Sequence, residues 1–323
     1  MRAFITGASG FIGKHLARHL LQNGWQVRAL VHDKKIIGLE DRLETVEGHI
    51  QNLTLLKEAL TGTDLIFHLA SALGASQIGR REFHAVNAEG TRTVLEAARE
   101  TGVRKVVHFS SAGVLGHVKN GEVAGEDYPP RPRDIYDRTK LEGEAIALES
   151  ARRGMDVVIV RPGWVYGPED RRTFKLIRAI ARGRFILVSK GKTLQTPVFV
   201  HDLIQGTMLS AEKGRRGEIY HLAGPEVLTV RIIVETIAAA SRKKIPRFHP
   251  PLFPVSAAAC LMGTAFSIFK KEAPLSPSRL SFFVHPKPLS IQKAVKELGF
   301  APKTYFQKGM FQTVAWYRDA GWL

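Results

Sequence analysis

The alternation of apolar and polar positions along residues 1–165 predicts short strands that are separated by longer helices. Short runs rich in β-branched and apolar residues are typical of strands, and longer amphipathic segments are typical of helices. The predicted strands are Arg2–Thr6, Gln26–Val31, Thr45–Glu47, Leu65–Leu69, Lys105–Ser110 and Asp156–Arg161, and the predicted helices are Phe11–Asn23, Leu53–Leu60, Arg80–Thr101 and Ile135–Arg153. Strands that alternate with helices form a parallel sheet with helices on both faces. We therefore predict an α/β fold with a doubly wound parallel sheet.

Beyond residue 166 the alternation becomes less regular. The predicted strands there are Pro197–Val200 and Glu218–Ala223, and the predicted helices are Arg171–Arg182, His201–Lys213 and Val230–Ser241, with a last helical period inside Ser290–Leu323 that Gly299 stops. This change of pattern predicts a second, smaller lobe at the C-terminal end, laid over the cleft of the first.

A glycine-rich turn directly follows the first predicted strand and opens the first predicted helix. Gly7 permits a tight turn, Gly10 lets the backbone approach a pyrophosphate, and Gly13 lets the helix pack closely. The free amides at the start of the helix then favour a phosphate. The residues of this turn that we expect to belong to the cofactor-binding site are Gly7, Ser9, Gly10, Phe11, Ile12 and Gly13. This turn predicts a Rossmann-type NAD(P)-binding domain in residues 1–165, to which residues 197–224 return, and a substrate-binding lobe in residues 166–196 and 225–323.

The end of the second predicted strand bears on the choice between NAD and NADP. NAD-specific sites usually place a carboxylate there, on the ribose 2′-hydroxyl. This chain instead has the sequence Val31-His32-Asp33-Lys34-Lys35, in which His32, Lys34 and Lys35 can face a 2′-phosphate. We therefore expect His32 and Lys35 to contact the cofactor and favour NADP, although Asp33 keeps NAD open.

The candidate catalytic residues are Ser111, Tyr136 and Lys140. Tyr136 and Lys140 stand one helical turn apart on the same face of a predicted helix. A phenol titrates too high to act as a base at neutral pH, and we expect the nearby lysine to lower its pKa. The Ser110-Ser111 pair ends an apolar strand, at the sheet edge where such folds bind ligands. A serine hydroxyl there can hold a substrate oxygen while Tyr136 moves the proton.

Together with these motifs, further stretches make the sequence resemble the extended short-chain dehydrogenase/reductase family, of the NAD(P)-dependent epimerase/dehydratase type. The resemblance covers essentially the whole chain. The matching stretches are Thr6–Gly13, Phe67–Ser71, Asn87–Thr91, Ser110-Ser111, Tyr136 with Lys140, Arg161–Pro168, Phe199–Asp202, Lys293–Pro302 and Trp316-Tyr317.

The resemblance implies a role for each matching residue. Tyr136 would be the acid/base, Lys140 would tune it and bind the nicotinamide ribose, and Ser111 would orient the substrate oxygen. The remaining positions implied to serve the cofactor are Ala70 and Ser71 along its path, Asn87 as a support of the catalytic helix, and Pro162 and Gly163 at the carboxamide end. One departure puts the adenine contacts in doubt, because Gly48-His49 stands where the family usually has Gly-Asp.

Two positions resemble one branch of this family more than the others. Pro162-Gly163-Trp164 replaces the Asn with which sugar-nucleotide enzymes hold the diphosphate, and Ala112-Gly113 replaces the acid pair of sugar dehydratases. What remains resembles the branch of 3β-hydroxysteroid dehydrogenases and dihydroflavonol reductases. We therefore expect an oxidoreductase that interconverts a secondary alcohol and a ketone on a sterol-, isoprenoid- or flavonoid-like substrate. A nucleotide-sugar epimerase and a non-catalytic NAD(P)-binding protein are the alternatives.

The net charge of +17 lies in one half of the chain. Residues 1–150 contain 19 Lys and Arg and 19 Asp and Glu, whereas residues 151–323 contain 28 and 11. This asymmetry favours an anionic partner such as a membrane surface or a phosphorylated ligand, and a solvated basic surface is the alternative. Aromatic residues do not alternate with Arg and Lys in a stacking pattern, so we expect no nucleic-acid partner.

An apolar run near the C-terminus suggests either a structural helix or a membrane contact. Leu252–Phe269 contains no charged residue and is followed by Lys270-Lys271. Pro254 and Gly263 make the run only mildly apolar, so we expect a helix that is buried or covers the substrate. An interfacial membrane anchor and a spanning helix are the alternatives. We also expect Cys260, inside this run, to be buried.

The remaining features concern the compartment. Met1-Arg2 leads straight into an apolar strand and the glycine turn, which leaves no room for a signal peptide. We expect a cytoplasmic protein, with peripheral contact at the inner membrane surface as an alternative. A single cysteine fits a reducing compartment and excludes a Cys-based zinc site, and we expect no metal. The family often forms homodimers, which the sequence does not test.

Overall fold

The computed structural model describes the whole chain except residues 33–35, 37, 40, 74–78, 247–249 and 269–276. In this described part, seven parallel strands form one sheet in the order β10-β6-β5-β4-β1-β2-β3. The strands are β1 (Arg2–Thr6), β2 (Gln26–Val31), β3 (Glu44–Glu47), β4 (Leu65–His68), β5 (Lys105–Phe109), β6 (Val157–Pro162) and β10 (Ile219–Leu222). The predicted doubly wound α/β fold is therefore confirmed.

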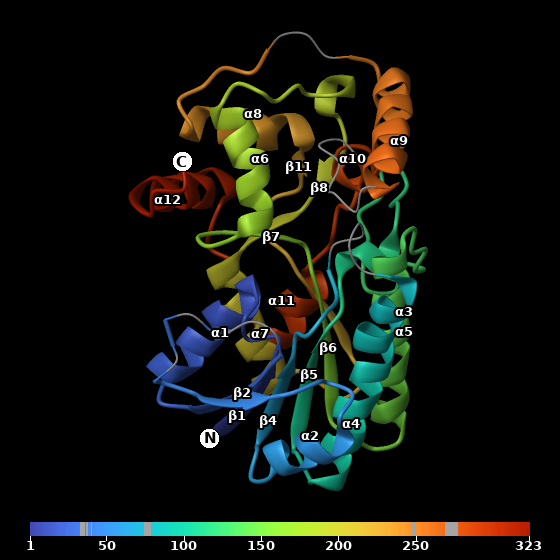
Figure 1. Ribbon diagram of the computed structural model, residues 1–323, viewed down its shortest axis with the longest axis vertical. Helices are drawn as coiled ribbons and strands as arrows, with labels where there is room; N and C mark the ends of the chain where they lie inside the picture. Colours follow the sequence, from blue (N-terminus) through green and yellow to red (C-terminus); the bar gives the residue numbers. More distant parts are fainter. Residues whose placement is uncertain (33–35, 37, 40, 74–78, 247–249, 269–276) are drawn as a thin grey trace.

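Helices cover both faces of the sheet (Figure 1). On one face lie α1 (Phe11–Gln22), α7 (Val200–Lys213) and α11 (Gln292–Leu298), and on the other lie α2 (Leu53–Leu60), α4 (Gly90–Glu100) and α5 (Ile135–Arg152). Two apolar cores result, one on each side of the sheet, because every central strand has apolar side chains on both faces. The sheet thus fixes the positions of the strand ends that build the site.

The predicted helix over Arg80–Thr101 is interrupted. It consists of α3 (Arg80–His84), a π-helical turn at Ala85–Glu89, and α4. A π-helical turn inserts an extra residue and often marks a functional position, and this one carries Asn87.

The C-terminal lobe has an apolar core of its own above the carboxyl ends of the strands (Figure 1). Its helices are α6 (Arg171–Ala181), α8 (Val230–Ala240), α9 (Leu252–Ile268), α10 (Pro277–Val284) and α12 (Phe306–Asp319). Its short strands are β7 (Trp164–Tyr166), which pairs with β9 (Pro197–Phe199), and β8 (Leu194–Gln195), which pairs with β11 (Leu228–Thr229). Two 3₁₀ turns lie at Ala112–Leu115 and Ser189–Gly191.

The sequence pattern missed β7, β8 and β11, because strands of two or three residues carry too few positions to show a period. It also missed the helices α10 and α12. The predicted stop at Gly299 is confirmed, since this residue ends α11 with a φ of +71°. The expectation that Cys260 is buried is wrong. The expected buried helix is wrong for one face of α9, where Phe253 and Leu261 are exposed. In a helix that is apolar all round, the pattern cannot indicate which face packs.

Candidate active site

The glycine turn lies at the carboxyl end of β1, where backbone segments approach one another closely. A Cβ atom on Gly7 would lie 2.7 Å from the Ala70 backbone nitrogen, and Gly7 has a φ of +76°. A Cβ atom on Gly13 would lie 2.7 Å from the Ala8 Cα atom. Both positions therefore require glycine, Gly7 against the end of β4 and Gly13 against the turn itself.

This turn has the donor set that a dinucleotide pyrophosphate needs. Gly10 caps α1 without a side chain, so nothing covers the first amides of the helix from that position. Ser9, Phe11 and Ile12 belong to the same exposed or half-buried stretch. The residues present fit the phosphates of NAD(P), which the helix dipole also favours.

The predicted adenine end brings His32 and His49 together. Their ring centroids are 4.0 Å apart, at the ends of the paired strands β2 and β3. The Gly48 amide donates a hydrogen bond to the Val31 carbonyl at 2.9 Å and holds the two strand ends side by side. His49 therefore lies next to His32 at this edge of the sheet. Lys35 lies outside the described residues.

The candidate catalytic residues also meet at the carboxyl edge. Ser111 follows β5 and opens a 3₁₀ turn by accepting a hydrogen bond from the Gly113 amide at 3.0 Å. Tyr136 lies in the first turn of α5, which Asp134 caps. Burial and the Asp137 charge raise the pKa of Tyr136, whereas the Arg172 charge and the nearby Ser111 and Ser71 hydroxyls lower it. The structure therefore brings Tyr136, Ser111 and Ser71 together, but the net pKa shift is opposite to the expected one, because burial outweighs the groups that stabilise the phenolate.

Lys140 lies one turn further along α5 and is almost fully buried. Burial lowers the pKa of Lys140 to about 8, and Glu144 opposes this shift. Within the part of the chain that the structure describes, its ammonium group forms no ion pair. A buried cation of this kind fits a ribose that offers hydroxyl acceptors.

Two buried histidines lie near Lys140. The His68 ring contacts the Thr6 hydroxyl through Nδ1 (2.7 Å) and the Thr91 hydroxyl through Nε2 (2.9 Å). Burial and the Lys140 charge lower the pKa of His68 to about 3. The His108 ring lies 5.2 Å from the His68 ring, and burial lowers its pKa as well. The two histidine rings beside Lys140 are therefore neutral near pH 7.

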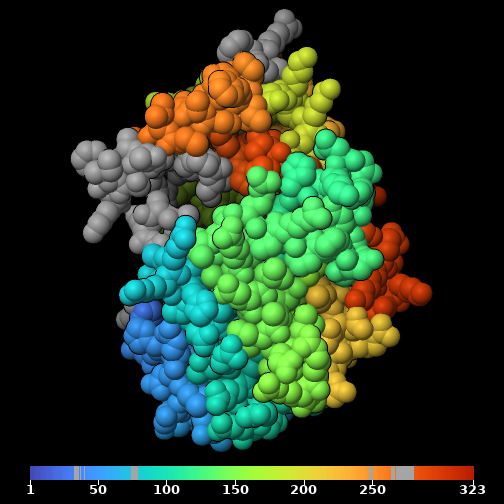
Figure 2. Space-filling model, turned by 90° about the vertical axis from the view of Figure 1, so that its right-hand side faces the viewer, coloured from blue at the N-terminus to red at the C-terminus, as the bar shows by residue number. Residues whose placement is uncertain are grey.

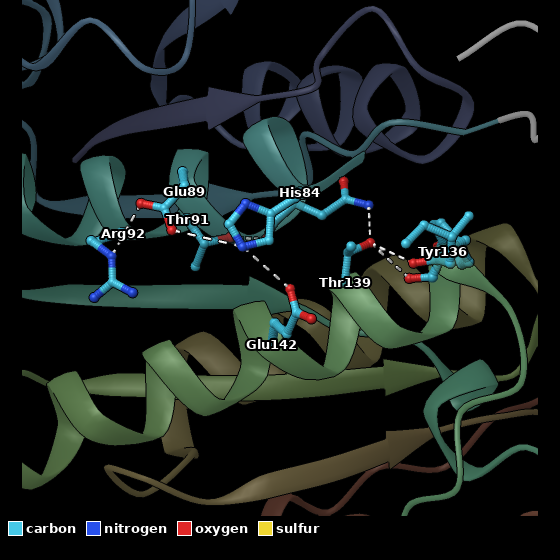
Figure 3. Close-up of polar contacts among 9 residues, drawn as sticks. His84, Glu89, Thr91, Arg92, Tyr136, Thr139 and Glu142 are labelled. Atoms are coloured by element: carbon cyan, nitrogen blue, oxygen red, sulfur yellow. Dashed lines mark hydrogen bonds and ion pairs between the residues drawn. The ribbon is translucent and has the colours of Figure 1, made fainter. Parts of the chain in front are cut away.

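Asn87 connects the end of β4 to the catalytic helix. Its Oδ1 atom accepts hydrogen bonds from the Ser71 hydroxyl (3.0 Å) and the Ala72 amide (2.8 Å). Its Nδ2 atom donates to the Thr139 hydroxyl at 2.9 Å. Thr139 in turn bonds the carbonyls of Ile135 and Tyr136, on the turn that carries the phenol (Figure 3). The structure thus places Asn87 as a support of this helix.

A second contact to α5 comes from His84, at the end of α3. The His84 ring lies 3.6 Å from a Glu142 carboxylate oxygen, and 4.0 Å from Glu89 (Figure 3). Both acids are half-exposed, so this contact contributes less to the position of α5 than the buried Asn87 bonds.

Asp137 and Arg172 are functional candidates that sequence reasoning missed. Asp137 lies beside the Ser111 turn, where a Cβ atom on Gly113 would be 2.7 Å from the Asp137 Cγ atom. Burial raises the pKa of Asp137 to about 6, and the Lys287 ammonium, 3.9 Å away, opposes this shift. Arg172 extends from the start of α6 in the C-terminal lobe. No local motif links Asp137 to Arg172, since they come from two separate helices, α5 and α6.

The expected carboxamide end lies where β6 leaves the sheet. Pro162 ends β6, and the Gly163 amide donates to the Leu222 carbonyl at 3.0 Å. The next residue, Trp164, packs against Phe282 of α10 with 4.7 Å between ring centroids and a tilt of 57° between the ring planes. The segment that follows β6 is thus lined by aromatic side chains of the C-terminal lobe.

Among the described residues no cluster of His, Cys, Asp or Glu could hold a metal ion. In the same part of the chain, no helix is long and apolar enough to cross a membrane.

Residues 3–223 match the NAD dependent epimerase/dehydratase family. A 4-hydroxy-2-methyl-3-oxo-4-farnesyl-3,4-dihydroquinoline-1-oxide ketoreductase of Stigmatella aurantiaca is 31% identical, over 96% of this chain and 95% of its own length. Sterol demethylase protein B of Methylococcus capsulatus is 30% identical, over 99% of both chains. The crystal structure of a dTDP-glucose 4,6-dehydratase from Streptomyces venezuelae, with NAD bound, superimposes with a TM-score of 0.78 at 27% identity, covering 100% of this chain and 98% of that one.

Proposed function

The chain belongs to the NAD-dependent epimerase/dehydratase family, and from this premise we propose that it interconverts a secondary alcohol and a ketone on a hydrophobic substrate. The observation that carries the proposal is the meeting of Ser111 and Tyr136 beside a buried Lys140. A protein that only binds the nucleotide needs no such arrangement around a phenol.

Each residue of the set has one role. The turn Gly7–Gly13 binds the pyrophosphate, and Lys140 binds the nicotinamide ribose. The bound nicotinamide supplies the hydride acceptor or donor. Ser111 donates a hydrogen bond to the substrate oxygen and orients the carbon that bears it. In the oxidation direction the Tyr136 phenolate takes the hydroxyl proton, and in the reduction direction the phenol returns it.

The remaining cofactor contacts are proposed from their place along the same edge. Ala70 and Ser71 line the path of the cofactor at the end of β4, and Pro162 and Gly163 enclose the carboxamide. His32, directly after β2, favours NADP, since an imidazole N–H can donate a hydrogen bond to a 2′-phosphate. We expect His32→Asp to shift the ratio of the NAD and NADP dissociation constants toward NAD, measured by titration of the intrinsic fluorescence.

Two observations support a hydrophobic substrate. Trp164 and Phe282 place aromatic surface directly after β6, where an amide would otherwise hold a sugar diphosphate. The Stigmatella relative is named for a ketone that carries a farnesyl chain, and the Methylococcus relative for sterol demethylation. An apolar alcohol or ketone therefore fits this end of the site better than a charged nucleotide sugar.

The test is nicotinamide absorbance at 340 nm with purified protein, NAD or NADP, and two substrate panels. Net reduction or oxidation with sterol- or isoprenoid-like alcohols and ketones is expected. Conversion of a nucleotide sugar, seen by chromatography with no net absorbance change, would instead establish an epimerase.

The matched variants are Tyr136→Phe and Tyr305→Phe. We expect Tyr136→Phe to abolish turnover while cofactor binding stays within about twofold, because only the proton-transferring oxygen is removed. Tyr305 is 62% exposed on the C-terminal lobe, and its replacement should leave both quantities unchanged. Lys140→Met should weaken turnover and cofactor binding together. Full turnover of Tyr136→Phe would remove Tyr136 from its role.

A further inference from the structure

The helix α9 is apolar on both of its faces. Leu252, Val255 and Ala259 face inward and pack with Val188 and Leu280 of the C-terminal lobe. On the other side, Phe253 is 84% exposed and Leu261 is 73% exposed. A helix on the surface of a globular protein normally has a polar outer face, so the outer face of α9 is exceptional.

Four of the exposed residues of α9 form one stripe. Phe253, Ala257, Cys260 and Leu261 are all exposed, and their spacing of four, seven and eight places them on the same side of the helix. We call these four residues the outer stripe of α9. Figure 2 shows α9 in orange at the surface near the top of the molecule, with no described element laid over it.

Cations gather beside the start of α9. The Ser189 amide donates a hydrogen bond to the Pro250 carbonyl at 3.0 Å, which holds the 3₁₀ turn Ser189–Gly191 against the entry to the helix. Lys190 and Lys192 are exposed there, and neither forms an ion pair in the described part of the chain. The exposed run Arg242–Lys244 precedes the helix in the sequence.

We propose that the outer stripe of α9, together with Lys190 and Lys192, docks the protein onto the surface of an anionic lipid bilayer. An apolar stripe bordered by cations is the chemistry of a helix that lies in the membrane interface. The apolar side chains enter the acyl boundary, and the lysines meet the negative headgroups. The charge asymmetry of the chain supports this partner, because residues 151–323 carry the whole excess of positive charge.

The first experiment is flotation of the full chain with phosphatidylcholine vesicles and with vesicles that also contain phosphatidylglycerol. We expect flotation with the anionic vesicles only, and its loss at about 1 M salt, where charge attraction is screened. The double variant Phe253→Ser/Leu261→Ser should bind at least about tenfold more weakly, since two apolar side chains that would enter the bilayer are lost. Lys190→Gln/Lys192→Gln should also weaken binding by about tenfold.

The matched control is Phe311→Ser. Phe311 on α12 is 46% exposed but lies outside the outer stripe, so this variant should float like the unaltered protein. Circular dichroism of all variants checks that the fold is retained. Equal flotation of Phe253→Ser/Leu261→Ser and Phe311→Ser would overturn the proposal, and so would equal binding to neutral and anionic vesicles.

The single cysteine of the chain gives an independent readout. Cys260 is exposed on the outer stripe, so a polarity-sensitive fluorophore on its thiol reports the surroundings of that face. Anionic vesicles should shift its emission to shorter wavelengths. A shift that depends on protein concentration and needs no vesicles would mean that a second copy of the chain covers the stripe, and the proposal would be overturned. Neither readout depends on turnover, so both can be interpreted if the proposed reaction is wrong.

Discussion

Replacing Asn87 with alanine tests the connection that holds the catalytic helix. Asn87 is fully buried, and its side chain makes three hydrogen bonds, to the Ser71 hydroxyl, the Ala72 amide and the Thr139 hydroxyl. Each such bond contributes about 1 kcal/mol net to stability. The buried Ala72 amide would lose its acceptor, which costs about 1 kcal/mol more. We therefore expect Asn87→Ala to lower the free energy of unfolding by about 4 kcal/mol.

The matched control is Asn52→Ala. Asn52 makes one side-chain bond, as the exposed cap of α2, to the Leu55 amide at 3.1 Å. Loss of such a cap costs about 1 kcal/mol. Urea unfolding followed by far-ultraviolet circular dichroism gives both values. The two substitutions are chemically identical, so a larger loss of stability in Asn87→Ala would come from burial and from the number of hydrogen bonds.

A second readout of Asn87→Ala is catalytic. Thr139 connects Asn87 to the Tyr136 carbonyl, so the phenol should lose part of its orientation, and turnover should fall more than cofactor affinity. A loss of stability in Asn87→Ala no larger than in Asn52→Ala would refute the reasoning, because the three buried bonds would then carry no net energy.

Three further predictions concern the corner around Asp137. Gly113→Ala should lower the free energy of unfolding, measured by urea titration, by about 1 to 3 kcal/mol, because the new Cβ atom would overlap Asp137. The double variant Gly113→Ala/Asp137→Ala should recover most of this loss. If the costs of the two substitutions simply add, the overlap is excluded. Arg172→Gln should raise the pKa of Tyr136, because the Arg172 charge lowers it, and should move the acid limb of the kcat/KM profile to higher pH. The control is Arg171→Gln, whose guanidinium lies 5.6 Å from the centre of the Trp322 ring, and it should leave the profile unchanged. Identical profiles of the two variants would contradict the prediction. The Asp137 pKa lies at about 6 against an ordinary 3.8, so the folded chain binds the proton more tightly and its carboxylate costs stability as pH rises through this interval. Asp137→Asn should therefore gain up to about 3 kcal/mol relative to the unaltered chain between pH 4 and pH 7, and a constant difference would contradict it.

The sequence predicted the parts of this protein that depend on local spacing. The strands and helices of the first half follow from hydrophobic periods. Apart from the interrupted helix at Arg80–Thr101, their observed bounds differ from the predicted ones by only a residue or so, as for Phe11–Gln22 against Phe11–Asn23. The glycine turn follows from three positions within eight residues, and the pairing of Tyr136 with Lys140 from one helical turn. Such features need only the neighbouring residues, so a pattern can show them.

The tertiary structure alone decided which distant residues meet. Asn87 reaches Thr139 because a π-helical turn re-aims it toward α5, and no hydrophobic period indicates such a turn. Arg172 and Lys287 approach the catalytic corner because the C-terminal lobe folds back over the strand ends. The outer stripe of α9 was hidden for a related reason. An apolar helix has no preferred face until the rest of the fold packs against one side, and only the packed lobe decides which face is left outside.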